Sequence, residues 1–339
     1  MLELHEPEGA FDRLEAWLSE ELRSGESADV YLGYGLSEPL RRESAPPPPE
    51  PCPLPLLVAR RSEPRASLAQ GGFAVGDWEP TWSTEDYAAA VDAVRAAIGR
   101  GDVYQANLVQ HLSAPFSGEP GALASALEPL RPLHPRPLGG AEWAIVSASP
   151  EVFLARRGDR LVTMPIKGTR PAGVDIDDEK DAAEHTMIVD LERNDLSRVC
   201  EPGTVRWPEL MVQHELAGVT HLVSRVEGQL RAGVRLAEIL AAMFPGGSVT
   251  GAPKVSALDH IARLEPVGRG ASMGALGVIR ANGDFDLALT IRTFAIAEGR
   301  IHLWVGGGIV WDSGPEAEIE ESWVKARPLL AAAGGLVPA

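Results

Sequence analysis

Cysteine is scarce in this 339-residue sequence, which contains only Cys52 and Cys200. Two cysteines cannot build a disulfide framework, and neither lies in a Cys-x-x-Cys pattern, so a disulfide-rich fold is excluded. No run of 18 apolar residues occurs, and we therefore expect no membrane-spanning helix. Because the first residues also lack a basic stretch followed by an apolar one, we expect a cytoplasmic protein in a reducing compartment.

Lysine is also scarce. Only four of the 31 basic residues are lysines: Lys167, Lys180, Lys254 and Lys325. Since the chain otherwise uses arginine for positive charge, each lysine is a candidate for a role that arginine cannot fill. Acidic residues outnumber basic ones, 48 to 31, and the net charge of −17 argues against nucleic acid or an anionic membrane surface as a partner.

Apolar residues make up 45% of the chain, enough for a sizeable core, and the length fits two domains or one large one. Residues 45–55 are rich in proline, and we expect a surface loop there because proline cannot sit inside a sheet. Helical and strand patterns become dense from residue 84 onward. We therefore predict an N-terminal region over 1–83 and a main domain over 84–332.

The hydrophobic periods predict an α+β fold of large antiparallel sheets covered by helices, because strands follow in hairpin order and strict βαβ alternation is missing. We expect Ser83 or Thr84 to cap the second helix, and Ser313 to cap the last one with Pro315 in its first turn. The expected helices cover 11–22, 84–98, 178–196, 255–264 and 315–330. The expected strands cover 30–34, 143–147, 152–155, 161–164, 221–230, 275–280, 285–296 and 300–310.

Two of these helices carry acidic residues at helical spacing. Glu318, Glu321 and Lys325 share one face of the last helix, and Asp181 and Glu184 share a face of the helix over 178–196. Such faces are usually solvated and salt-bridged. If the two faces met, their carboxylates would form an oxygen-only site that suits Mg²⁺ rather than zinc.

Two glycine-rich segments could approach a ligand closely. Phe244–Lys254 leads into a helix, whose N-terminus would offer backbone N–H groups to an anion, although an ordinary turn explains the pattern equally well. Its Ala-Pro-Lys ending differs from a nucleotide-binding P-loop. Gly306–Gly308 ends an apolar strand, and three residues without a Cβ indicate close approach of a ligand or of another backbone.

Four single residues are further candidates. Lys167 follows an apolar strand, where burial would favour the neutral amine, a nucleophile or base; the alternative is a loop lysine paired to a carboxylate. Arg292 stands inside an apolar pattern and needs an anionic partner. His221 begins another apolar pattern, where histidine is more often structural, and Glu151 has the position of a turn residue.

A series of motifs follows in fixed order along the chain: Gly101–Leu108, Ser149–Glu151, Pro165–Pro171, Glu184–Asp195, Phe244–Lys254, Ile291–Thr293 and Gly306–Val310. This series resembles the chorismate-utilising enzymes, which include anthranilate synthase component I, aminodeoxychorismate synthase component I and the isochorismate and salicylate synthases. The resemblance implies a chorismate-binding catalytic domain over 84–332 with an anthranilate synthase component I-like sandwich of antiparallel sheets. Residues 1–83 would be a shortened N-terminal region with the proline-rich loop at 45–55.

Within this family, Lys167 favours aminodeoxychorismate synthase, because anthranilate synthases typically carry alanine at that position. The resemblance implies that Lys167 attacks C2 of chorismate as the 4-hydroxyl leaves, and that ammonia then adds at C4 and expels the lysine. The product would be 4-amino-4-deoxychorismate, the precursor of p-aminobenzoate and folate. Gln105 stands where isochorismate and salicylate synthases have a lysine that activates water, which argues against water as the nucleophile.

The resemblance also implies the other site residues. Glu151 would be the general acid and base, and His221 would lie beside the substrate ring. Mg²⁺ would be held by Glu184 and Glu321, with Asp181 and Glu318 in a water-mediated shell. The substrate-binding residues would be Thr169, Thr250, Arg292, Gly306, Gly307, Gly308 and Lys325, with Arg292 on the enolpyruvyl carboxylate.

The resemblance implies a class I glutamine amidotransferase partner that supplies ammonia. Neither cysteine of this chain has the sequence context of a glutaminase nucleophile. The alternative within the fold is anthranilate synthase component I, and the alternative of another class is a non-catalytic chorismate-binding regulatory protein. Three residues, Ala172, Ser272 and Val278, depart from those that relatives often have around the pocket. The segment with which relatives bind tryptophan is not found, so we do not expect feedback inhibition.

Overall fold

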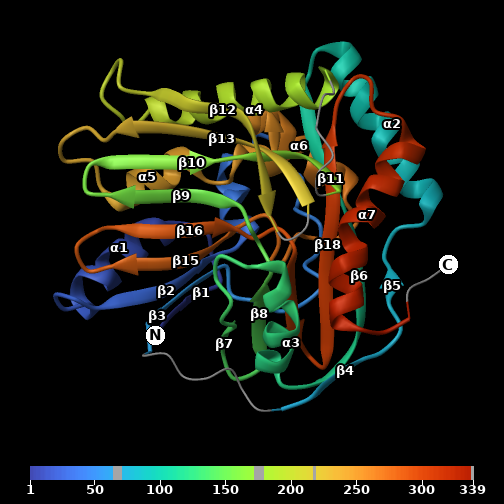
Figure 1. The fold of residues 1–339 in the computed structure, drawn as a ribbon, viewed down its shortest axis with the longest axis horizontal. Helices are drawn as coiled ribbons and strands as arrows, with labels where there is room; N and C mark the ends of the chain where they lie inside the picture. Colours follow the sequence, from blue (N-terminus) through green and yellow to red (C-terminus); the bar gives the residue numbers. More distant parts are fainter. Residues whose placement is uncertain (64–70, 172–178, 217–218, 337–339) are drawn as a thin grey trace.

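A computed structural model describes residues 1–63, 71–171, 179–216 and 219–336, without the side chains of 169–171, 179–181, 215–216 and 219. Two antiparallel sheets dominate the fold, and their strands run crosswise to each other (Figure 1). Helices pack against both sheets, so the architecture is the α+β arrangement of large antiparallel sheets flanked by helices that the sequence predicts.

The first sheet has ten strands within the described residues, in the order β1-β3-β2-β15-β16-β9-β10-β13-β11, with β12 paired to β13. The N-terminal strands β1–β3 therefore belong to the same sheet as strands from much later in the chain. The bounds are β1 Leu2–Leu4, β2 Ser27–Leu32, β3 Leu57–Arg61, β9 Val152–Arg157, β10 Arg160–Met164, β11 Ile166–Pro171, β12 Arg206–Leu216, β13 Val219–Gln229, β15 Ala275–Arg280 and β16 Phe285–Leu289.

The second sheet has eight described strands, in the order β14-β6-β18-β17-β8-β7, with β4 and β5 paired to β6. Its two long central strands, β6 and β18, pair along ten residues of register, from Pro115 opposite Arg300 to Ala106 opposite Ile309. The bounds are β4 Phe73–Val75, β5 Glu79–Pro80, β6 Gln105–Gly118, β7 Leu138–Gly139, β8 Trp143–Ser147, β14 Gly251–Ala252, β17 Thr293–Ala297 and β18 Arg300–Ile309.

The helices divide between the two sheets. One set packs on the first sheet: α1 Ala10–Glu21, α4 Glu179–Ser197 and α5 Leu236–Met243. Another set covers the second sheet: α2 Thr84–Arg100, α3 Pro120–Leu127 and α7 Pro315–Ala333, while α6 Lys254–Leu264 packs on β6. Short 3₁₀ helices cover Tyr34–Leu40, Glu128–Leu130 and Gly247–Val249. The largest apolar cluster includes residues of both sheets, such as Leu154 and Trp304, so the sheets share a core.

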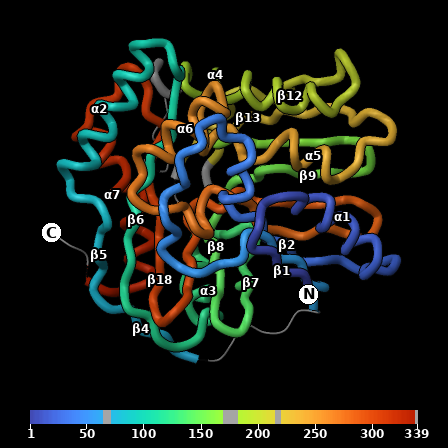
Figure 2. Tube along the Cα trace, turned by 180° about the vertical axis from the view of Figure 1, so that it is seen from behind, coloured from blue at the N-terminus to red at the C-terminus, as the bar shows by residue number. Residues whose placement is uncertain are grey.

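The segment between β2 and β3, which contains the proline-rich residues 45–55, runs beside α6 (Figure 2). The backbone N–H groups of Arg42 and Glu43 donate to Oδ1 of Asp259 on α6, at 3.2 and 3.3 Å. The N–H of Gly268 donates to the carbonyl of Pro49 at 2.8 Å. These contacts tie the N-terminal region to the rest of the chain, and the division at residue 83 stays a prediction.

Helix ends follow the expected capping rules in one case and depart from them in another. Ser83 caps α2, since its hydroxyl accepts the N–H of Asp86 at 3.0 Å. The prediction that Ser313 caps the last helix is wrong. The N-cap of α7 is Gly314, and Ser313 instead accepts the N–H of Val310 at 3.0 Å, closing the turn before the helix.

The prediction of one strand over 285–296 is also wrong. The segment forms β16 in the first sheet and β17 in the second, and the chain crosses between the sheets at Thr290–Arg292. Arg292 has φ = 50°, a left-handed conformation that no continuous strand contains. The crossing moves Arg292 out of a strand interior and into the junction of the two sheets.

Candidate active site

Two neighbouring crossovers between the sheets create the candidate site. The chain passes from β8 to β9 through Ala148–Glu151, and from β16 to β17 through Thr290–Arg292. Backbone hydrogen bonds join the crossovers: Ala148 N–H donates to the carbonyl of Arg292 at 2.9 Å, and Leu289 N–H donates to that of Glu151 at 3.0 Å. Glu151 and Arg292 are therefore fixed side by side, although 141 positions separate them in the sequence.

Glu151 is a buried carboxyl with a shifted proton affinity. Its side chain accepts the hydroxyl of Ser248 at 2.9 Å, and the residue is only 5% exposed. Burial raises the pKa of Glu151 to about 7, against the opposing effects of the Ser248 hydrogen bond and the nearby charges of Lys167 and Arg292. A carboxyl that is partly protonated at neutral pH can act as a general acid or base.

Arg292 is the charged neighbour from the second crossover. Burial lowers the pKa of its guanidinium, and the negative charge of Glu151 acts in the opposite direction. The sequence predicted an anionic partner for this residue, and the structure provides Glu151 as one source of negative charge.

Lys167 reaches the same junction from β11. It is paired opposite Leu222 of β13, and its ammonium Nζ lies 3.9 Å from Oε2 of Glu184 on α4. Both side chains are largely buried, 15% and 14% exposed. Nζ also lies 3.2 Å from the position that a Cβ on Gly308 would occupy. The lysine is thus a strand residue and not the loop residue of the alternative, although it does pair with a carboxylate as that alternative expected.

Gln105 is the polar residue that shares this space with Lys167. It begins β6, it is fully buried, and neither amide atom has a hydrogen-bond partner within the part of the chain that the structure describes. A Cβ on Gly308 would collide with its Nε2. A buried amide with unsatisfied donors and acceptors beside a lysine is a polar surface suited to a ligand.

The three glycines of β18 have separate reasons to lack a Cβ. A Cβ on Gly306 would collide with the carbonyl of Leu108 on the paired strand β6. Gly308 leaves room for Gln105 and Lys167. At Gly307 a Cβ would lie 3.3 Å from Oε1 of Glu321 and 3.4 Å from Oε2 of Glu318. The close approach of another backbone is therefore observed at Gly306, while Gly307 and Gly308 leave space for polar side chains of this chain. Close approach of a ligand stays a prediction.

The acidic face of α7 is turned toward this strand. Lys325 donates to the carbonyl of Gly306 at 2.9 Å and to Oε1 of Glu321 at 2.7 Å. Glu318 is buried at 3% exposure. This face is thus partly packed against β18 at Glu318, while Glu321 is half exposed and ion-paired with Lys325, as on a solvated, salt-bridged face. Its ligand-binding role stays a prediction.

Two further predicted residues line the junction. His221 on β13 is 1% exposed, and its Nδ1 donates to the carbonyl of Gly168 at 3.0 Å, beside Lys167. Burial lowers the pKa of His221, which favours the neutral ring. Thr250 is fully buried, and its hydroxyl donates to the carbonyl of Gly246 at 2.9 Å. The side chains of Thr169 and Asp181 lie outside those that the structure describes.

Three of the four carboxylates expected to hold a metal, those of Glu184, Glu318 and Glu321, have described side chains. Glu318 and Glu321 present carboxylate oxygens beside the space that a Cβ on Gly307 would occupy, and Glu184 lies beside Lys167. Among the described side chains no group of three His, Cys, Asp or Glu is gathered closely enough to hold a metal by itself. Mg²⁺ often binds through one or two carboxylates, with water and substrate oxygens completing the shell, so this arrangement is compatible with it.

Lys254 receives a structural explanation that its motif did not give. It is the first residue of α6, and its Nζ donates to Oδ2 of Asp195 at 2.6 Å and to the carbonyl of Met243 at 3.1 Å. Both side chains are nearly buried, so the ion pair joins α4, α5 and α6 behind the glycine-rich turn.

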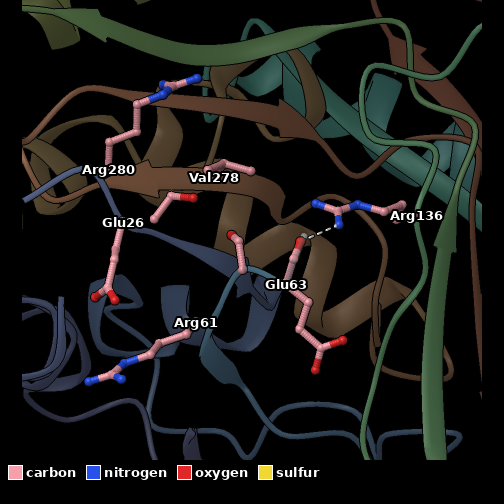
Figure 3. A pocket seen from close by; sticks show the side chains of 9 residues that line it. Glu26, Arg61, Glu63, Arg136, Val278 and Arg280 are labelled. Carbon is pink, nitrogen blue, oxygen red and sulfur yellow. Dashed lines mark hydrogen bonds between the residues drawn. The ribbon is translucent and has the colours of Figure 1, made fainter. Parts of the chain in front are cut away.

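A separate cavity of about 530 Å³ lies far along the first sheet, at the ends of β2, β3 and β15 (Figure 3). Its arginines already have partners: Arg61 contacts Glu21, Arg280 contacts Asp286, and Arg136 donates to the carbonyl of Glu63. Val278, which the family resemblance placed around the substrate pocket, lines this cavity instead (Figure 3). None of the residues predicted to be catalytic, substrate-binding or metal-ligating lines it. The candidate site is therefore the junction of the sheets and not this cavity.

Comparison with known families identifies the family to which the chain belongs. The profile of chorismate-binding enzymes matches residues 41–331, most of the chain. The chain belongs to the chorismate-binding enzyme family. It is 44% identical to anthranilate synthase component 1 of Thermus thermophilus, over 75% of this chain and 58% of that protein. It is 40% identical to aminodeoxychorismate synthase component 1 of Klebsiella aerogenes, over 75% of this chain and 59% of that protein.

Solved structures agree with this assignment. The crystal structure of anthranilate synthase component I from Streptococcus pneumoniae superposes with a TM-score of 0.81 at 26% identity, covering 94% of this chain and 85% of that one. The menaquinone-specific isochorismate synthase of Escherichia coli shares the fold with a TM-score of 0.67, over 80% of this chain and 65% of that one. This chorismate-binding enzyme spans just over half the length of the curated relatives it matches. None of the described helices combines the length and apolar composition that a membrane span requires.

Sequence reasoning missed two residues of the site region in this chorismate-binding enzyme. Ser248 binds Glu151, and Glu192 of α4 accepts the N–H of Gly247 at 3.1 Å. The only sequence signal for Ser248 was its position inside Phe244–Lys254, where it was one residue of a turn. Glu192 likewise had only its position inside the motif Glu184–Asp195. An acidic residue on a charged helix normally faces solvent, whereas here it is 2% exposed.

Proposed function

We propose that this chain catalyses the amination of chorismate at C4, giving 4-amino-4-deoxychorismate. The observation that carries the proposal is the position of Lys167, whose amine lies among Gln105, Gly308 and Glu184 at the junction that also holds Glu151. A lysine amine inside a polar, largely enclosed site is suited to covalent catalysis. Arginine could not replace it, because a guanidinium stays protonated.

In the proposed reaction the neutral amine of Lys167 forms a bond to C2 of the ring. The ring double bonds shift, the C4–O bond breaks, and Glu151 donates the proton with which the 4-hydroxyl leaves as water. Ammonia then bonds to C4 and gives a proton to the carboxylate of Glu151, the double bonds shift back, and the C2–N bond breaks to return the neutral lysine amine. The sum is chorismate plus ammonia giving aminodeoxychorismate plus water, and the covalent step divides one difficult substitution into two easier ones.

The other residues of the site bind and orient the substrate in this proposal. Arg292 holds the enolpyruvyl carboxylate, where a guanidinium can make two parallel hydrogen bonds. Lys325 and the backbone of Gly306–Gly308 lie toward the ring carboxylate, with His221, Thr169 and Thr250 beside the ring. These contacts would place a dianionic substrate in a local region of positive charge within an acidic protein.

We assign Mg²⁺ to the carboxylates of Glu184 and Glu321, with Asp181 and Glu318 as the nearby acidic residues. When bound, Mg²⁺ would neutralise the ring carboxylate of the substrate. The donor set supports the assignment because it contains only oxygen ligands, which Mg²⁺ prefers.

Ammonia would come from a partner subunit, a class I glutamine amidotransferase, in this proposal. Several relatives carry names that include "component 1", such as those of Thermus thermophilus and Klebsiella aerogenes. In the described structure neither buried cysteine, Cys52 or Cys200, lies at the proposed site. Burial raises the pKa of both thiols, to about 12 and about 11, which disfavours the reactive thiolate of a glutaminase.

The alternative reaction is anthranilate formation, which is favoured by the 44% identity to an enzyme of that name. Both reactions require chorismate and the same site. Purified protein incubated with chorismate, Mg²⁺ and excess ammonium should consume chorismate, and chelation of Mg²⁺ should stop consumption until the metal is restored. Absence of chorismate consumption under these conditions would contradict both reactions and favour a non-catalytic binding role.

A further inference from the structure

The turn over Gly246–Thr250 is held in place by one bond within it and by two bonds from outside. Its first carbonyl, that of Gly246, accepts the hydroxyl of Thr250 at 2.9 Å. The N–H of Gly247 donates to Glu192 on α4 at 3.1 Å, and the carbonyl of Val249 accepts Nη1 of Arg269 at 2.8 Å. Because Glu192, Thr250 and Arg269 are all buried, these bonds are shielded from competing water.

Ser248 is the one residue of this turn that is not fully buried. Its neighbours Gly247 and Val249 are fixed by the bonds described above, so the Cα of Ser248 has little freedom to move. From this fixed point its hydroxyl donates to Oε1 of Glu151 at 2.9 Å. The turn therefore holds the hydroxyl of Ser248 against the carboxyl of Glu151, which lies in the crossover between β8 and β9.

The charged groups around Glu151 come from several elements. Lys167 of β11 and Arg292 of the second crossover favour the carboxylate, as does the backbone N–H of Ile166. Glu192 of α4, whose own pKa burial raises to about 8, interacts with Glu151 unfavourably across the turn. Among these groups, Ser248 is the uncharged side chain that donates a hydrogen bond to Glu151. It is also the group whose position the turn fixes directly.

We propose that Ser248 is a positioning residue for Glu151. It holds the carboxyl in the orientation from which Glu151 delivers a proton to the leaving hydroxyl, and Glu192 and Arg269 fix the turn that contains Ser248. One part of this role rests on the proposed function, namely that the group which receives the proton is the 4-hydroxyl of chorismate. The orientation of Glu151 by Ser248 follows from the contacts of the turn alone.

A direct titration tests the contact without relying on activity. In protein labelled with ¹³C at the glutamate carboxyl carbons, the resonance absent from Glu151→Gln belongs to Glu151, and its midpoint in the parent should lie near 7. Ser248 donates to the charged form, so removing it in Ser248→Ala should raise the midpoint by about one pH unit. Ser248→Thr keeps the hydroxyl and should restore the parent midpoint.

Ser256→Ala is the matched control, because Ser256 donates to the carbonyl of Asp102 at 2.8 Å, away from Glu151. It should leave the Glu151 midpoint unchanged, and thermal melting should show that all variants fold. An unchanged midpoint in Ser248→Ala would overturn the proposal, whether or not the enzyme turns over chorismate.

The same variants give a kinetic readout. If Glu151 acts as the general acid, it must be protonated, so the alkaline limb of the kcat profile should move upward in Ser248→Ala together with the titration midpoint. A mispositioned acid should also lower kcat by about tenfold with little change in KM for chorismate. Parent-like kcat and profile in Ser248→Ala would overturn the catalytic part of the role. A parent enzyme that consumes no chorismate would refute the proposed function, while the titration would still decide the positioning role.

Discussion

Replacement of Lys167 by alanine should lower the rate of chorismate amination by about 10³-fold or more, because removal of a covalent nucleophile eliminates the two-step route. The site itself should survive the change. Within the described residues, Nζ of Lys167 makes a long contact of 3.9 Å with Oε2 of Glu184, and its backbone is paired in β11. Stopped assays of chorismate consumption with saturating ammonium and Mg²⁺ measure the effect.

Lys167→Arg is the informative control for charge. It keeps a cation beside Glu184 but cannot form the covalent bond, because the guanidinium stays protonated. It should therefore be as inactive as Lys167→Ala. In the parent, incubation with chorismate without ammonia should add one chorismate less one water to the peptide that contains Lys167, as read by mass spectrometry. Lys167→Ala that retains more than about a tenth of the parent rate would contradict the nucleophilic role.

Replacement of Arg269 by alanine should lower the free energy of unfolding by about 3–5 kcal/mol, since it leaves a buried carboxylate without its partner. Glu265 and Arg269 are 2% and 1% exposed, and Nη2 of Arg269 lies 2.7 Å from Oε1 of Glu265. Arg269 also donates to the carbonyl of Asn107 at 2.8 Å and lies 4.5 Å from the ring centre of Tyr34. Urea unfolding followed by fluorescence measures the loss.

The double variant Arg269→Met with Glu265→Gln separates the charge effect from packing. It removes both charges and keeps an acceptor for the N–H of Val109, which Glu265 accepts at 3.1 Å in the parent. Since replacement of both members of a buried ion pair is often nearly neutral, the double variant should be more stable than Arg269→Ala. An Arg269→Ala protein within about 1 kcal/mol of the parent would show that the buried pair does not have this energetic role.

Strands with a regular hydrophobic period could be predicted from the sequence. The prediction failed where one apolar run of residues forms strands in two different sheets. Strands at 143–147 and 275–280 match their observed bounds, because each forms part of a single sheet. The run 285–296 is apolar on both sides of Arg292, so its pattern is that of one long strand. Only the left-handed Arg292 marks the crossing, and a backbone angle is not visible in the sequence.

The long strand β6 was missed for a different reason. Four polar residues, Gln105, Asn107, Gln110 and His111, break up its apolar pattern, and all four are buried. Their burial depends on what lies opposite: the glycines of β18, Ser322 of α7, which receives the amide of Gln110 at 2.5 Å, and His302, which lies 3.1 Å from His111. Such compensation between distant segments cannot be predicted from local patterns.

Those residues of the candidate site that belong to a motif or to a regular helical spacing could be predicted from the sequence. Resemblance grouped Lys167, Glu151 and Arg292, and the structure brings them to one junction. Helical spacing grouped Glu318, Glu321 and Lys325, which lie together at β18. The contact of Ser248 with Glu151 could not be predicted, because it joins residues 97 positions apart through a turn whose shape depends on buried partners.

The identity of the amination product tests the central claim most directly. Purified protein incubated with chorismate, Mg²⁺ and ammonium should yield a product that chromatography and mass spectrometry identify as 4-amino-4-deoxychorismate. p-Aminobenzoate should appear only after a lyase is added, and Lys167→Ala should form neither compound at a measurable rate. Direct release of anthranilate from the parent protein would contradict the account and assign the chain to the alternative reaction.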